Sequence, residues 1–273
     1  MVKAFVERHP LALALLLAAA SFGIAVLSVA TSRKPVVSDV QEVAPADLAL
    51  PTESEQAFDI FWSTGNLFWV LVAVLAVGLL VWVGWLREAG FVWPPRWRNA
   101  HLLAFPLLVG VLALSDGVRI SGVWIFLATL LTVLVATFGE EALFRGLMLR
   151  ALVPSGLVRA MILTSLLAGA LQFGASTLTG PWPEAVLATV LTTCGGFTYA
   201  ALRWRTASIW PVLLLHTLVS LAIAISTPGA VLYLVLLLLS TLGFVAYGLF
   251  LLRNSRTRAD GGPEVREILT QAR

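Results

Sequence analysis

Charged side chains are scarce in this chain. Only 12% of its 273 residues are charged, whereas 59% are hydrophobic. A soluble domain carries about 25% charged residues, so this composition excludes an ordinary soluble globular protein. A bilayer core about 30 Å thick needs roughly 20 apolar residues per helix, and apolar stretches of that length recur along the chain. We therefore predict a polytopic integral membrane protein.

Cysteine is almost absent as well. The single cysteine, Cys194, excludes an internal disulfide and a cysteine-based metal cluster. It lies in an apolar stretch, which favours a packed small residue over a nucleophile. The net charge of +3 is small, and basic residues at the inner face of a membrane explain it. We predict no nucleic-acid partner.

Polar residues do not alternate with apolar ones, as the strands of an outer-membrane barrel require. Runs such as VLYLVLLLL, at 231–239, are apolar at every position. We therefore predict an all-α fold, a polytopic membrane bundle of about eight transmembrane helices. The expected ranges are 10–30, 60–86, 101–115, 121–138, 156–175, 184–202, 207–225 and 230–252.

Lysine and arginine in short loops stay on the cytoplasmic side of a membrane. With the N-terminus inside, only Arg33, Lys34 and Arg119 fall outside, which leaves 15 of the 18 basic residues inside. We therefore expect both ends to be cytoplasmic (N-in/C-in). The first helix is expected to be an uncleaved span, with a cleaved signal peptide as the alternative.

The predicted organisation has five parts. A cytosolic N-terminus precedes a first group of transmembrane helices that includes a flexible acidic external loop. A core of helices, one final transmembrane helix and a cytosolic tail follow. The ranges of these parts are 1–9, 10–120 with its loop at 31–59, 121–226, 227–252 and 253–273.

Very few ionisable residues lie within the central helices. They are Glu140, Glu141, Arg145 and His216, and ionisable residues at membrane depth are costly enough to suggest function. Glu141 and Arg145 are four residues apart and can pair on one helix face. Glu140 points about 100° away, free to face a cavity. The alternative is an ordinary helix end with these side chains exposed to solvent.

The string EEALFR at 140–145 resembles the EExxxR motif of the CPBP family of intramembrane proteases. This family includes the CAAX-processing endopeptidases and the bacterial bacteriocin-immunity and lysostaphin-resistance-like proteins. Downstream, GGF at 195–197, SIWP at 208–211 and His216 resemble the third motif region of the family. The resemblance covers about residues 127–220.

Two positions depart from the pattern of the family. Its second motif has a phenylalanine followed four residues later by a histidine, and Ala168 and Gln172 stand at those places. In the third motif, Ser220 replaces the usual asparagine. Neither His9 nor His101 has the sequence context to replace the missing histidine.

The resemblance implies a role for each matching residue. Glu140 would be the general base that takes a proton from water, and Arg145 would hold Glu141. His216 and Ser220 would donate hydrogen bonds to the oxyanion, and the amide of Gln172 could orient a water or a substrate carbonyl. A divalent metal such as zinc, if any, would be held by Glu140, Glu141 and His216. This set lacks one customary ligand, so we favour a metal-independent water.

The leading functional hypothesis is an intramembrane endopeptidase of the CPBP, or CAAX protease-like, type in a bacterial cytoplasmic (inner) membrane. Its partners would be the lipid bilayer and a peptide or membrane-protein substrate. The alternative is a catalytically degenerate member of the same fold, acting as an immunity or scaffold protein. A proton-coupled transporter is a lesser alternative, because it predicts inverted repeats that we do not find in the sequence.

Overall fold

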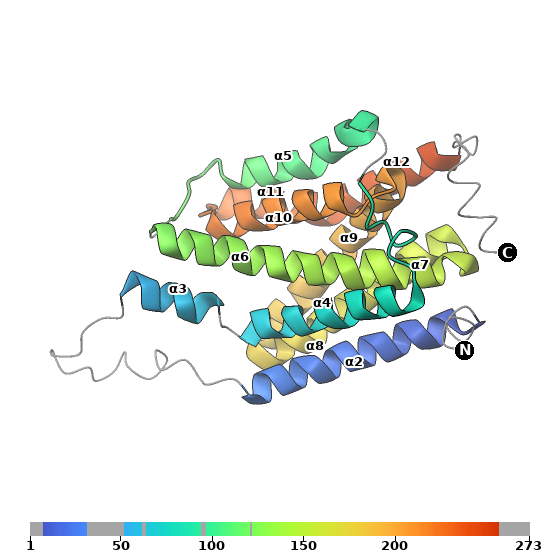
Figure 1. Ribbon diagram of the computed structural model, residues 1–273. Coiled ribbons are helices and arrows are strands. Elements are labelled where there is room, and N and C mark those ends of the chain that lie inside the picture. Colours follow the sequence, from blue (N-terminus) through green and yellow to red (C-terminus); the bar gives the residue numbers. More distant parts are fainter. Residues whose placement is uncertain (1–7, 32–51, 62–63, 94–96, 121, 257–273) are drawn as a thin grey trace.

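The computed structural model describes residues 8–31, 52–61, 64–93, 97–120 and 122–256, which form a bundle of helices (Figure 1). Within these ranges the only pairing of extended backbone is an isolated bridge between Val118 and Ser226. Six of the described helices are long and apolar enough to cross a membrane, and two apolar helices are shorter. The all-α, multi-pass membrane fold predicted from the sequence is confirmed.

The N-terminal part of the bundle contains few long helices. Its elements are α2 (Pro10–Thr31), α3 (Glu53–Phe61), α4 (Thr64–Val83), the 3-10 helix η2 (Trp97–Leu103) and α5 (Ala104–Ala113).

The remaining elements follow without a long loop. They are α6 (Val123–Glu140), the π-helix η3 (Glu141–Met148), α7 (Leu149–Leu152), the 3-10 helix η4 (Val153–Ser155), α8 (Leu157–Thr179), α9 (Trp182–Thr206), α10 (Trp210–Ile225), α11 (Ala230–Leu238), the π-helix η5 (Leu239–Gly243) and α12 (Phe244–Arg256). Figure 1 shows that α2 begins and α12 ends at the same end of the bundle.

The helix that we expected to end at Phe138 continues much further. The span runs without a break from Val123 to Ser155, because apolar residues persist to Leu152 and no proline interrupts them before Pro154. The glutamate pair therefore lies inside a helix and not at its end.

Part of the segment that we expected to be a flexible acidic loop is the helix α3. Thr52 and Glu55 form its capping box, in which the Thr52 N–H and hydroxyl donate to Glu55 Oε2 at 2.8 and 2.9 Å. These two bonds hold the pKa of the Glu55 carboxyl below its usual value. Glu53 Oε1 accepts from the Trp124 N–H at 2.8 Å, which docks α3 on the first turn of α6. The other predicted loop residues, 32–51, and the ends, 1–7 and 257–273, lie outside the described residues.

Two hydrophobic clusters flank the middle of the bundle. One joins α2, α4, η3 and α8 around buried residues such as Leu80 and Phe144. The other joins α5, α8, α9, α10 and α12 around residues such as Leu202 and Val212. The helical span of α6 and η3 reaches α10 on one side and α4 on the other. Its polar residues thus lie between two apolar regions.

Helices α8 and α9 contact each other extensively and approach closely at Gly169. A Cβ at this position would overlap the Thr193 hydroxyl and lie 3.2 Å from the Thr189 carbonyl oxygen. We expect Gly169→Ala to lower the free energy of unfolding by about 1 to 3 kcal/mol, because an overpacked contact forces helices apart. Thermal unfolding of the purified protein in detergent measures this.

The matched control is Gly78→Ala in α4, where a Cβ would meet no atom within 4 Å. This variant should be as stable as the parent or slightly more stable, because alanine is the better helix former. Equal effects of the two substitutions would contradict the proposed close contact.

Candidate active site

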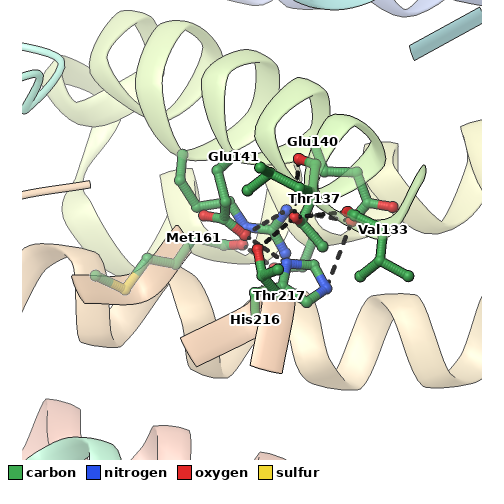
Figure 2. Close-up of polar contacts among 10 residues, drawn as sticks. Val133, Thr137, Glu140, Glu141, Met161, His216 and Thr217 are labelled. Atoms are coloured by element: carbon green, nitrogen blue, oxygen red, sulfur yellow. Dashed lines mark hydrogen bonds and ion pairs between the residues drawn. The ribbon is translucent and has the colours of Figure 1, made fainter. Parts of the chain in front are cut away.

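Four ionisable side chains from two neighbouring helices meet within the bundle (Figure 2). Glu140 is the last residue of α6, Glu141 and Arg145 belong to η3, and His216 comes from α10. His216 Nδ1 lies 2.9 Å from Glu141 Oε1, which is a hydrogen bond between the two helices. Residues 75 positions apart in the chain thus form one polar cluster.

The π-helix places both glutamates beside the same arginine. Arg145 Nη1 lies 3.5 Å from Glu141 Oε1 and 3.9 Å from Glu140 Oε2. In an α-helix, Glu140 and Arg145, five residues apart, would point about 140° away from each other. A π-helix, whose hydrogen bonds link residues five apart, is wound more loosely, so these two side chains point in more similar directions than in an α-helix. The sequence-based expectation that Glu140 points away from this pair therefore differs from the structure.

Burial divides the four residues into two kinds. The side chains of Glu141 and Arg145 are 0% and 2% exposed, whereas those of Glu140 and His216 are 17% and 14% exposed. A buried carboxylate is tolerated only with a partner, and here the partners are Arg145 and His216. The alternative of a solvent-exposed helix end does not apply. Glu140 and His216 are the two members of the cluster that keep some exposure to solvent.

The bond to Glu141 sets the role of each ring nitrogen in His216. An ionised carboxylate can only accept, so Nδ1–H of His216 donates to Glu141 Oε1. The other nitrogen, Nε2, then faces Glu140, with its Oε2 atom 3.9 Å away. Glu141 thus orients the imidazole toward Glu140.

Helix α9 packs against this cluster through Tyr199 and Gly196. The ring of Tyr199 packs on that of His216 with centroids 4.5 Å apart and planes 30° apart, and Arg145 Cζ lies 5.8 Å from the centre of the Tyr199 ring. Gly196 gives room to the guanidinium, since a Cβ there would lie 3.2 Å from Arg145 Nη2. Sequence reasoning missed Tyr199, although its position three residues after Gly196 places both on one face of α9.

A pair of buried threonines joins α6 to α10 beside the cluster. Thr137 Oγ1 lies 2.7 Å from Thr217 Oγ1. Because Thr137 already donates to the Val133 carbonyl at 2.8 Å, the Thr217 hydroxyl is the donor of the bond between the helices. This pair also escaped sequence reasoning, though Thr137 lies four residues before Glu141 and Thr217 directly follows His216.

Two of the residues singled out in the sequence stand apart from this network. Gln172 donates from Nε2 to Ser176 Oγ at 2.9 Å, within its own helix α8. Ser220 is half-buried and lies one turn after His216 on α10. In the part of the chain that the structure describes, the hydrogen bonds and ion pairs of the cluster reach neither residue.

The proposed metal ligands do not form a metal site here. No group of three or more His, Cys, Asp or Glu side chains among the described residues could hold a metal ion. Glu141 Oε1 already accepts from His216, and the cationic Arg145 lies beside both carboxylates. This donor set does not fit zinc.

Fold and cluster together define a multi-pass membrane protein with a cluster of ionisable side chains inside its helical bundle. The model of the type II CAAX prenyl endopeptidase Rce1-like family matches residues 122–222. This match confirms the resemblance to the CPBP intramembrane proteases, and the matched segment contains all four cluster residues. The comparisons with curated proteins and with solved structures found no match.

The threonine pair predicts a measurable coupling between α6 and α10. In a double-mutant cycle of Thr137→Val and Thr217→Val, we expect a coupling energy of about 0.6 to 1.7 kcal/mol, as found for hydrogen bonds between membrane helices. Unfolding in a titration with denaturing detergent measures it. Thr129→Val is the control, because within the described ranges the Thr129 hydroxyl bonds only to Ile125 O of its own helix. A coupling no larger than that between Thr129 and Thr217 would contradict the assignment.

Proposed function

We propose that this protein is an intramembrane endopeptidase of the CPBP type, which hydrolyses a peptide bond near the membrane with a water activated by Glu140. The observation that carries the proposal is the unequal state of the two glutamates. Glu141 is fully buried and bonded to His216, whereas Glu140 keeps some exposure and faces His216 Nε2. One carboxylate therefore orients the site, and the other is available to a reacting molecule.

In the proposed reaction, Glu140 removes a proton from a water whose oxygen attacks the carbonyl carbon of the scissile peptide. A tetrahedral oxyanion forms, the C–N bond breaks, and Glu140 passes its proton to the leaving amine. Glu141 keeps His216 in place, and Arg145 balances the negative charge of the glutamates. Ser220 is the candidate to donate a hydrogen bond to the oxyanion, as asparagine would in the family motif.

The proposed substrate is a peptide segment close to the membrane anchor of another protein. A buried acid–base centre in a multi-pass helical bundle is accessible to such a segment and not to a soluble protein at large. We propose that the reaction is metal-independent and takes place in a bacterial cytoplasmic (inner) membrane, with no nucleic-acid partner.

One observation favours a second candidate, a catalytically degenerate member of the same fold that acts as an immunity or scaffold protein. Gln172 stands where the family has its second histidine, and its amide bonds to Ser176 and not to the cluster. An amide cannot act as a base. A protein of this second kind would have the same fold and the same interhelical cluster but would not cleave a substrate.

The test compares new peptide termini in membranes of the native host that express the wild type, Glu140→Gln, Glu184→Gln or Gln172→His. With wild type we expect termini that fall by about 100-fold or more with Glu140→Gln, because general-base catalysis is lost while the side-chain shape is kept. Quantitative mass spectrometry of labelled N-termini provides the measurement. Glu184, in the first turn of α9, is the control carboxylate and should leave the termini unchanged.

The two candidates give opposite results in this experiment. Identical termini in wild type and Glu140→Gln would contradict the protease proposal. If cleavage then appears only with Gln172→His, the protein is a disabled protease fold and the scaffold role gains support.

A further inference from the structure

Glu140 Oε2 lies near two nitrogen atoms of the cluster, across gaps that are too long for direct hydrogen bonds. Glu140 Oε2 lies 3.9 Å from Arg145 Nη1 and 3.9 Å from His216 Nε2. A polar contact longer than about 3.5 Å is commonly bridged by a water. Two atoms at this separation can each lie roughly 2.8 Å from a single water oxygen.

Arg145 offers an independent sign of a ligand at this point. Its side chain is 2% exposed, and its Nη1 group has no hydrogen-bond partner within the described residues. Buried donors in native proteins almost always have a partner. The ion-pair partners of Arg145, Glu141 Oε1 and Glu140 Oε2, lie 3.5 and 3.9 Å from Nη1 and form no hydrogen bond with it. The buried Nη1 group thus has N–H donors that no described protein atom satisfies.

We propose that Arg145 contacts the nucleophilic water directly and, with His216 Nε2, holds it against Glu140. This inference rests on the proposed protease function. In the family motif, a histidine at the place of Gln172 would contact the water together with Glu140. The proposal assigns that contact to Arg145 and His216 instead. It also assigns His216 to the water and leaves Ser220 to stabilise the oxyanion.

The directions of the hydrogen bonds agree with this arrangement. Arg145 can only donate, so it binds one lone pair of the water. In the neutral imidazole of His216, Nδ1–H donates to Glu141, so Nε2 accepts one O–H of the water, and Glu140 Oε2 accepts the other. The second lone pair stays free to attack the carbonyl carbon. When Glu140 takes the proton, the positive charge of Arg145 stabilises the hydroxide that forms.

The substitution that tests the proposal is Arg145→Lys, which keeps a cation near Glu141 but removes the Nη1 donor. Its control is Arg150→Lys, the same chemical change in another largely buried arginine. Arg150 donates from Nε to Glu88 Oε2 at 2.6 Å and lies 4.8 Å from the centre of the Trp85 ring, apart from the cluster. Both variants exchange an ion-paired arginine, so a general loss of folding would affect both.

For cleavage of a peptide whose sequence comes from the termini experiment, we expect Arg145→Lys to lower kcat by about 100-fold or more, as for loss of one donor at a reacting oxygen. KM should stay near its wild-type value, and Arg150→Lys should change kcat by less than about twofold. An Arg145→Lys enzyme that cleaves as fast as Arg150→Lys would overturn the proposal.

A second measurement does not depend on turnover. The chain has only 3 histidines, so the ring nitrogens of His216 can be assigned in histidine-labelled protein in lipid bilayers by comparison with His216→Gln. Water-edited solid-state NMR should show contact between water and His216 Nε2 in wild type and Arg150→Lys. That contact should be lost in Arg145→Lys, while the Nδ1 signal stays at its wild-type position.

This pair of measurements separates failure of the inference from failure of the proposed function. A water contact that depends on Arg145 in a protein without cleavage supports the water site and contradicts only the protease function. A wild-type His216 without water contact, or with the same contact in Arg145→Lys, overturns the inference whatever the activity. A shifted Nδ1 signal in Arg145→Lys would also overturn it, because Arg145 would then act by holding Glu141.

Discussion

The hydrogen bond between Glu141 and His216 is the interaction on which this site depends. A carboxylate that is 0% exposed inside a membrane protein loses its hydration, and only bonded or charged partners offset that loss. The imidazole from α10 and the guanidinium from the next turn of η3 are these partners. Removal of either would leave a buried charge uncompensated. The bond therefore fixes the position of α10 relative to α6 as well as the direction of the ring.

Other features of the bundle make this bond possible at some local cost. The π-helix is a rare conformation, found most often at functional sites, and here it gathers two adjacent glutamates around one arginine. Because Gly196 has no side chain, the guanidinium of Arg145 can approach α9 closely. Tyr199 covers the imidazole from the side. A regular α-helix in place of η3, and a larger residue in place of Gly196, would separate the charged side chains of the cluster. The departures from regular helix structure therefore occur at the cluster itself.

Much of the architecture could be predicted from hydropathy, because a long apolar run has few alternatives in a membrane. The pairing of Glu141 with Arg145 followed from their spacing alone. The contact of Glu140 with the same arginine could not be predicted from spacing. Spacing rules assume an α-helix, and the π-helix depends on packing around η3. Tyr199 and the Thr137–Thr217 pair were missed because contacts between distant helices leave no periodic signal. Helix α3 was missed because acidic, polar composition resembles a loop until Glu53 is seen to cap α6.

The shortness of α10 has a consequence for the lipid around the protein. Its 16 residues span about 24 Å at 1.5 Å per residue, less than the roughly 30 Å of a hydrocarbon core. It packs against α5, which is shorter still with 10 residues. Hydrophobic mismatch of this kind is met by local thinning of the bilayer. Where the bilayer thins in this way, headgroups and interfacial water lie closer to α10 and its His216, which would give the proposed protease a route for water.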